Sequence, residues 1–139
     1  MNKTLAISLA VLLAISAAFA YYVVEYAPSE NVEGGGKTVN VTLEINFSNG
    51  TVWHYNVNIS GEDATVFTAL LHAANIAGFD VKYTYYGQYD SYFIDSIAGA
   101  GGNGRYWIYY VNGEMGEVGV DKKIVYEGDK IEWRLEEFS

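Results

Sequence analysis

The stretch that decides the fold is VNVTLEINF, residues 39–47. Apolar and polar side chains alternate strictly along it, which is the pattern of a strand with one face in the core. Asn49-Gly50 follows, a pair suited to a two-residue turn with positive φ. The alternation resumes over residues 53–59, so the sequence predicts a β-hairpin with one apolar face.

A helix is predicted directly after this hairpin. Asp63 or Thr65 can cap its start, and Gly78 can end it after Ala77. Apolar side chains recur along it at helical spacing, so one side of the helix would lie on the sheet. These side chains are Val66, Phe67, Leu70, Leu71 and Ala74.

Strands are expected again after the helix. Residues 105–111, RYWIYYV, form the strongest of these and are closed by Asn112-Gly113. The others are residues 79–86, reached by a crossover, a short strand over 92–97, and a last hairpin made of 124–126 and 130–135. With all strands in a single sheet that cradles the helix, the expected fold class is α+β, a β-grasp-like mixed sheet packed on one helix.

The segment before this domain is interpreted as a targeting segment. Residues 5–24 carry no charge and are long enough to cross the roughly 30 Å hydrocarbon core of a bilayer. Lys3 lies before them and acidic residues follow, which predicts that the rest of the chain is exported. Ala18-Phe19-Ala20 also fits a signal peptidase site, so the segment is either a membrane anchor or a signal peptide cleaved after Ala20. The expected organisation is residues 1–26 for the anchor or signal peptide, 27–37 for a flexible linker and 38–139 for the folded domain.

Composition excludes several classes of function. The formal net charge of -9 repels phosphate backbones, so nucleic acid is not expected as a partner. The chain has no cysteine, which excludes disulfides, thiolate metal sites and a cysteine nucleophile. His54 and His72 are the only histidines and are not grouped with acidic residues, so neither a metal site nor a catalytic residue is predicted. GAGGNG, residues 99–104, is followed by a strand and not by a helix, so it is interpreted as a loop rather than a phosphate site.

Several separated motifs resemble the transcobalamin-like C-terminal domain family. They are the helix entry ATVFTAL at residues 64–70, WIYYVNG at 107–113, Gly119-Val120-Asp121, and GDKIEW at 128–133. The resemblance covers about residues 39–135 and implies a β-grasp-like exported domain. Because vertebrate members use this domain as one half of a cobalamin carrier, the resemblance also implies a corrinoid as a candidate ligand.

Tyrosine is the unusual residue of this chain, with 13 copies. Such rings either pack across strands or form a recognition surface, because tyrosine combines a large rigid ring with a polar tip. In RYWIYYV, alternation separates Tyr106, Ile108 and Tyr110 from Trp107, Tyr109 and Val111, and one of these two faces is expected in the core. The candidate ligand-binding residues are Tyr85, Tyr86, Tyr89, Tyr92, Trp107 and Tyr109.

The sequence therefore predicts an exported, non-catalytic domain without a cofactor that binds a small molecule. A surface interaction or adhesion module, or an accessory subunit of a surface complex, is the other interpretation. In both cases the membrane would be contacted only through the N-terminal segment.

Four asparagines begin N-x-S/T sequons, which predicts glycosylation outside the cell. They are Asn40, Asn46, Asn49 and Asn58. Three of them, all except Asn49, fall on the outward face of the predicted hairpin, so that face would not be the binding surface.

Overall fold

The structure of the chain is a computed structural model that describes residues 37–138. The predictions for residues 1–26, and for the linker up to residue 36, lie outside the described residues. Within residues 37–138, no helix is both long and apolar enough to cross a membrane.

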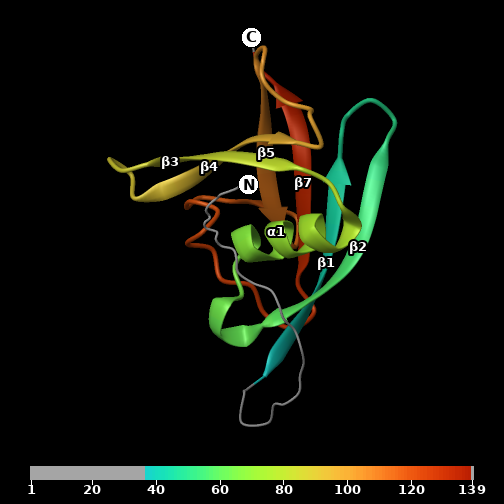
Figure 1. Cartoon of the computed structure of the whole chain (residues 1–139), viewed down its shortest axis with the longest axis vertical. Coiled ribbons are helices and arrows are strands. Elements are labelled where there is room, and N and C mark those ends of the chain that lie inside the picture. The colour runs from blue at the N-terminus through green and yellow to red at the C-terminus, as the bar shows by residue number, and fades with distance from the viewer. Residues whose placement is uncertain (1–36, 139) are drawn as a thin grey trace. The chain divides into compact units, whose positions relative to one another are not determined.

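Five strands form the main sheet, in the order β2-β1-β7-β5-β6. Their bounds are Thr38–Asn46 for β1, Val52–Ser60 for β2, Arg105–Val111 for β5, Glu114–Met115 for β6 and Lys130–Glu137 for β7. β7 runs parallel to β1 and antiparallel to β5, and it lies between them (Figure 1). The expected mixed sheet packed on one α-helix is confirmed.

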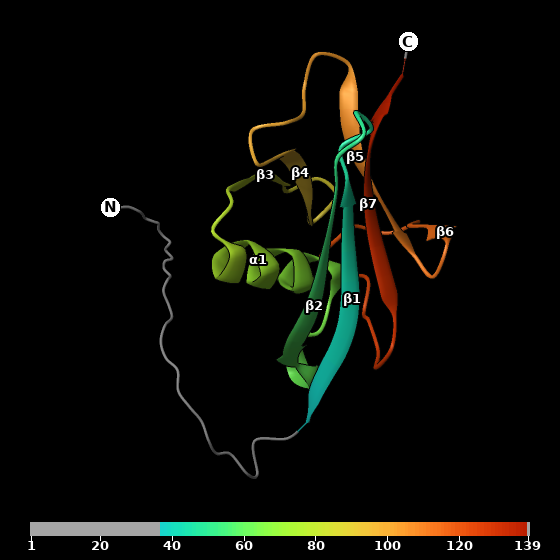
Figure 2. The ribbon, with the colours of Figure 1, turned by 90° about the vertical axis from the view of Figure 1, so that its right-hand side faces the viewer.

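The helix α1, Val66–Ala77, follows the short 3-10 helix η4, Gly61–Asp63, and lies on one side of the main sheet (Figure 2). Thr65 is its N-cap, because the Thr65 hydroxyl accepts a hydrogen bond from the Thr68 amide while Thr68 Oγ1 accepts one from the Thr65 amide. Gly78 ends the helix at φ 84°, a left-handed conformation that glycine adopts without strain. The apolar side is buried at Val66, Ala69, Leu70, Ala73 and Ala74, whereas Phe67 and Leu71 are half-buried.

The core lies between α1 and the main sheet. Alternate residues of β1 and β7 point toward the helix, so Leu43, Ile45, Ile131 and Trp133 are almost fully buried. Leu70 meets them from the helix and has no exposed surface. Burial of this apolar area is the main source of stability for a domain without disulfides.

The strands β3, Val81–Tyr86, and β4, Ser91–Ile97, form a separate two-stranded antiparallel sheet. The prediction of a single sheet is therefore wrong. The hairpin packs on α1 and does not extend the main sheet. There the rings of Tyr92 and Phe67 stack with centroids 4.8 Å apart. Figure 1 shows the hairpin running across the strands of the main sheet rather than alongside them.

The turn between β1 and β2 also differs from the prediction. Phe47 pairs with Thr51 through the Phe47 amide and the Thr51 carbonyl, so three residues form the turn instead of two. Ser48 takes a positive φ because its amide donates to Asn46 Oδ1 and its hydroxyl donates to the Leu135 carbonyl. This register keeps the Phe47 ring on Trp53, with centroids 4.8 Å apart.

The predicted hairpin of residues 124–126 with the last strand is wrong as well. The Val125 amide donates to the Ala64 carbonyl, and the Lys123 carbonyl accepts from the Val66 amide. These bonds hold the segment on the start of α1, where Ile124 forms an isolated bridge with Thr65. β7 is consequently free to insert between β1 and β5.

The core packing predicts a large cost for removing Leu70. Leu70→Ala should lower the free energy of unfolding by about 2–5 kcal/mol, because it removes buried apolar surface and leaves a cavity. Ile76→Ala, on the same helix at 71% exposure, should change it by less than about 0.5 kcal/mol. Urea denaturation followed by tryptophan fluorescence measures both, and equal effects would contradict the assigned helix face.

Candidate functional site

Exposed aromatic rings gather where the β3–β4 hairpin approaches β5. They line an open groove of about 520 Å3, called the tyrosine groove below. Its lining residues are Tyr86, Tyr89, Ser91, Tyr92, Phe93, Tyr106 and Gly119. The hairpin supplies most of them, β5 supplies Tyr106, and the segment after β6 supplies Gly119. None of the lining side chains is charged.

Strand pairing explains which rings reach the groove. Tyr86 pairs with Ser91 and Thr84 pairs with Phe93, so Tyr86 and Phe93 share one face of the hairpin. Tyr85 pairs with Tyr92 on the other face, which packs on α1 through the stack of Tyr92 on Phe67. One face of the hairpin thus holds it on the helix, and the opposite face supplies Tyr86, Ser91 and Phe93 to the groove. Tyr92, on the helix-facing side, also belongs to the groove lining.

The groove walls are rings set at steep angles to one another. The Phe93 ring lies between Tyr86, at a centroid distance of 6.4 Å and an angle of 78°, and Tyr106, at 6.5 Å and 66°. The exposed fractions are 44% for Tyr86, 39% for Phe93 and 42% for Tyr106. Tyr89, at the tip of the hairpin, is 72% exposed. Aromatic rings combine a large apolar area with, in tyrosine, a polar tip, and such side chains are enriched in binding sites.

The hairpin is attached to the main body by Gly119 and Asp121. Asp121 Oδ1 accepts hydrogen bonds from Ser91 Oγ at 2.8 Å and from the Tyr92 amide at 3.1 Å, and Asp121 Oδ2 accepts one from Lys122 Nζ at 2.8 Å. A Cβ at residue 119 would fall 1.5 Å from Ser91 Oγ, so only glycine permits this approach. The Gly119-Val120-Asp121 motif therefore fixes the wall of the groove that β4 provides.

The Asp121 carboxyl is held in its ionised form. Burial by itself would raise its pKa, but the hydrogen bonds from Lys122, from Ser91 and from the Tyr92 amide outweigh burial and lower the pKa to about 2. The same contact with Asp121 raises the pKa of Lys122. Lys122 also donates to the Asp90 carbonyl, so this ammonium is engaged by the hairpin and does not face the groove lining.

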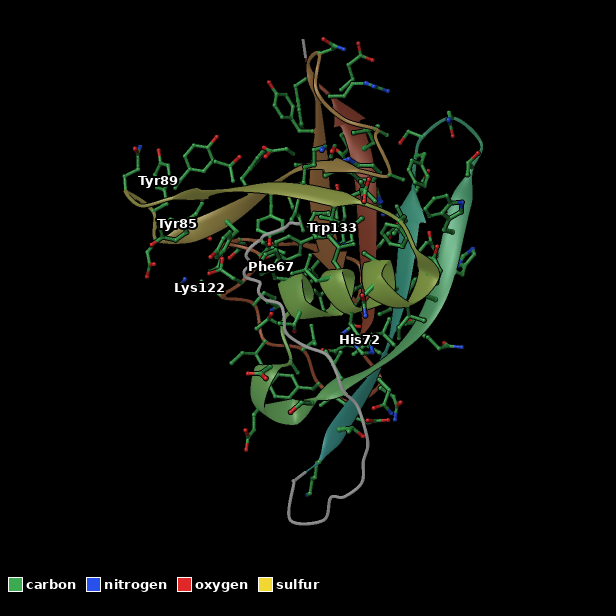
Figure 3. All side chains as sticks on the ribbon, in the orientation of Figure 1. Phe67, His72, Tyr85, Tyr89, Lys122 and Trp133 are labelled. Carbon is green, nitrogen blue, oxygen red and sulfur yellow. The ribbon has the colours of Figure 1, made fainter. Side chains whose placement is uncertain are left out.

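The six predicted ligand-binding residues lie in three places: the groove, the hairpin outside the groove, and the core. Tyr86, Tyr89 and Tyr92 line the groove. Tyr85 shares the helix-facing side of the hairpin with Tyr92 but lies outside the groove lining, and its hydroxyl donates to Asp90 Oδ1 at 2.6 Å. Figure 3 shows Tyr85 and Tyr89 near the outer end of the hairpin, away from Trp133.

Trp107 and Tyr109 lie in the core instead of the groove. Both are buried, with the Trp107 indole donating to the Ala100 carbonyl and the Tyr109 hydroxyl donating to the Val118 carbonyl. Burial is also the main cause of the raised pKa of Tyr109. We therefore leave these two residues out of the proposed ligand contacts.

Sequence reasoning missed Ser91, Phe93, Tyr106 and Gly119. The alternation in RYWIYYV gives a signal for Tyr106, because Tyr106 and Trp107 lie on opposite faces of the strand. If Trp107 is in the core, Tyr106 lies on the other face, where a ligand could reach it. Phe93 gives no such signal, because a short strand over residues 92–97 does not show which of its faces is exposed. Gly119 belongs to the Gly119-Val120-Asp121 motif. Its contact with Ser91 joins segments far apart in the chain, so the sequence does not predict it.

The sequon asparagines lie in and beside the first hairpin. Asn40 and Asn58 are opposite each other on β1 and β2, and Asn58 Nδ2 donates to Asn40 Oδ1 at 2.7 Å. Asn46 Oδ1 accepts from the Ser48 amide, and Asn49 Oδ1, in the exposed turn, accepts from the Thr51 amide. Their glycosylation stays a prediction.

Metal ligands are not grouped in the part of the chain that the structure describes. No set of three or more histidine, aspartate or glutamate side chains there is arranged to hold an ion. His72 lies half-buried on α1, and burial lowers its pKa.

The fold and the groove define a small α+β domain with an exposed aromatic site. Residues 63–137 match the family described as "Domain of unknown function (DUF4430)", and because this range is more than half of the chain, the chain belongs to that family. All lining residues of the tyrosine groove fall inside the matched range. No curated protein matches the chain.

Two solved structures share the fold at low sequence identity. Haptocorrin in complex with Cbi superposes with a TM-score of 0.66 and 16% identity over 80% of this chain, which spans 27% of the haptocorrin chain. A protein from Ruminococcus gnavus ATCC 29149, described only by a proposed metal-binding role, superposes with a TM-score of 0.56 and 19% identity over 73% of this chain and 99% of its own. Both likenesses concern the fold alone.

Acid should weaken the attachment of the hairpin. Because the pKa of Asp121 is about 2 in the folded chain and about 3.9 when unfolded, its contribution is complete above pH 4 and is lost as the pH falls through 2. The Asp121 carboxylate, whose side chain is 17% exposed, contributes about 2 kcal/mol to the free energy of unfolding. Asp121→Asn should therefore flatten the fall in unfolding free energy between pH 5 and pH 2.

Denaturant titrations across this pH range check the prediction. Lys122→Met keeps the carboxylate but removes one of its hydrogen bonds, so its pH dependence should lie between those of the wild type and Asp121→Asn. Identical pH profiles for all three chains would contradict the role given to Asp121.

Proposed function

We propose that this chain is a non-catalytic domain that binds a small organic ligand in the tyrosine groove. The observation that carries the proposal is the set of rings at Tyr86, Tyr89, Phe93 and Tyr106, which line one groove and remain 39–72% exposed. Exposed rings cost free energy in water, and their burial under a ligand would recover it. The few polar atoms around them, such as the tyrosine hydroxyls and Ser91 Oγ, can orient the ligand.

A corrinoid is the first ligand to test. Haptocorrin, in complex with Cbi, shares the fold of this chain, although the chain corresponds to only about a quarter of haptocorrin. The parallel pair of β1 and β7 at the centre of a sheet crossed by one helix also supports a β-grasp-like arrangement, as in the transcobalamin-like domains that the sequence resembles.

The proposed location is outside the cell membrane. The uncharged residues 5–24 support export whether they remain as an anchor or are cleaved after Ala20. Determination of the mature N-terminus by mass spectrometry separates these two forms.

A protein partner is the second candidate, because β3 is an open edge. Within the described residues β3 pairs only with β4, and all but one of its residues are exposed. An edge of this kind can accept a strand from another chain. Cross-linking in native membranes followed by identification of a partner joined to residues 81–86 would support it, and recovery of the solitary chain would oppose it.

Titration of cobalamin and cobinamide tests the groove directly. Binding should change the corrin absorbance, and Phe93→Ala or Tyr106→Ala should weaken it at least about tenfold, since each removes a wall of the groove. Tyr126→Ala is the control, because Tyr126 is 64% exposed but lies outside the groove. No absorbance change at high micromolar ligand would exclude corrinoids.

A further inference from the structure

The ring faces of the tyrosine groove present negative charge. An aromatic ring carries a negative face and a positive edge, so a cation placed over the ring is attracted to it. Phe93 meets Tyr86 and Tyr106 in edge-to-face contacts at 78° and 66°, and each of these three rings keeps 39–44% of its surface exposed. Such walls resemble the aromatic cages that hold alkylated ammonium groups.

Carboxylates lie beside the walls on the same strand faces. Asp95 is two residues beyond Phe93 on β4, so both side chains project from one face, and Asp95 Oδ2 accepts from Thr84 Oγ1 at 2.6 Å. Glu136 pairs directly with Tyr106 across β5 and β7. Neither carboxylate lines the groove, but both lower the electrostatic potential around it.

The basic side chains near the groove are directed elsewhere or engaged. Arg105 precedes Tyr106 on β5 and therefore projects to the other face. Lys82 shares the face of Tyr86 but pairs with Ser96 at the far end of the hairpin. Lys122 is held by Asp121 and Asp90, and Arg134 by Glu132.

We propose that the tyrosine groove selects an organic cation, of the quaternary or alkylated ammonium class, over a neutral group of the same shape. The inference rests on the proposed function, because it names the ligand class of the same groove. The groove volume of about 520 Å3 leaves room for a larger molecule that carries such a group. The formal net charge of -9 adds a long-range attraction for the cation.

Choline and its carbon isostere dimethylbutanol, in which carbon replaces the nitrogen, are the matched probes. The full chain in a non-ionic detergent is titrated with each, and NMR shifts of the Tyr86, Phe93 and Tyr106 signals report binding. Choline should bind at least about fivefold more tightly than dimethylbutanol, since only the cation gains from the ring faces. Equal affinities, or tighter binding of the neutral probe, would overturn the proposal.

Variants of the walls locate the preference. Phe93→Leu and Tyr106→Leu keep an apolar side chain but remove the ring. The ratio of the affinity for choline to the affinity for dimethylbutanol should therefore fall toward one. Tyr106→Phe keeps the ring and should retain the preference, as should Tyr126→Leu outside the groove. A preference that survives both leucine variants would place the cation elsewhere and overturn the proposal.

The two proposals fail in different ways. If both probes bind equally and Phe93→Leu weakens both, the groove is a ligand site without cation selectivity. If neither probe shifts the NMR signals of the groove residues, the cation proposal is wrong. The corrinoid titration then tests whether the groove binds a ligand at all.

Discussion

The attachment of residues 119–125 to the start of α1 is the constraint on which the rest of the structure depends. The first amides of a helix have no partners inside it, and here the Val66 amide donates to the Lys123 carbonyl and the Phe67 amide to the Val120 carbonyl. Val120 itself is buried in the core between helix and sheet. Asp121, the next residue, accepts hydrogen bonds from β4. A single short segment thus positions the helix, the main sheet and the hairpin relative to one another.

This attachment explains why a groove exists at all. The hairpin pairs with no strand of the main sheet, so Asp121 and the stack of Tyr92 on Phe67 determine where it lies. Rings on the helix side are used for packing, as with Tyr83, whose centroid is 5.1 Å from that of Phe67. Rings on the other side line the groove, where the Phe93 ring contacts the Tyr106 ring at a centroid distance of 6.5 Å. Because side chains alternate along a strand, one face of the hairpin holds it on the helix and the other face contributes rings to the groove.

Local elements could be predicted from the sequence, whereas their partners could not. The period of two in residues 39–47 and the cap and stop of α1 are encoded by neighbouring residues, and the structure confirms them. The turn at Ser48 depends on the distant Leu135 carbonyl, and residues 124–126 depend on Ala64, which no local pattern reports. For the site, the alternation in β5 does not determine which of its two faces is buried. Only the neighbours of β5 show that Trp107 is buried and that Tyr106 is 42% exposed.

Packing alone does not account for the rings at the groove. Tyr83 and Tyr92 contact α1, and Tyr109 fills the core against Trp133, so these tyrosines stabilise the fold where they stand. Tyr89 is 72% exposed and contributes little buried area, and a smaller polar residue would satisfy a hairpin tip equally well. The exposed part of these rings carries a cost in water, which a ligand that covers them would remove.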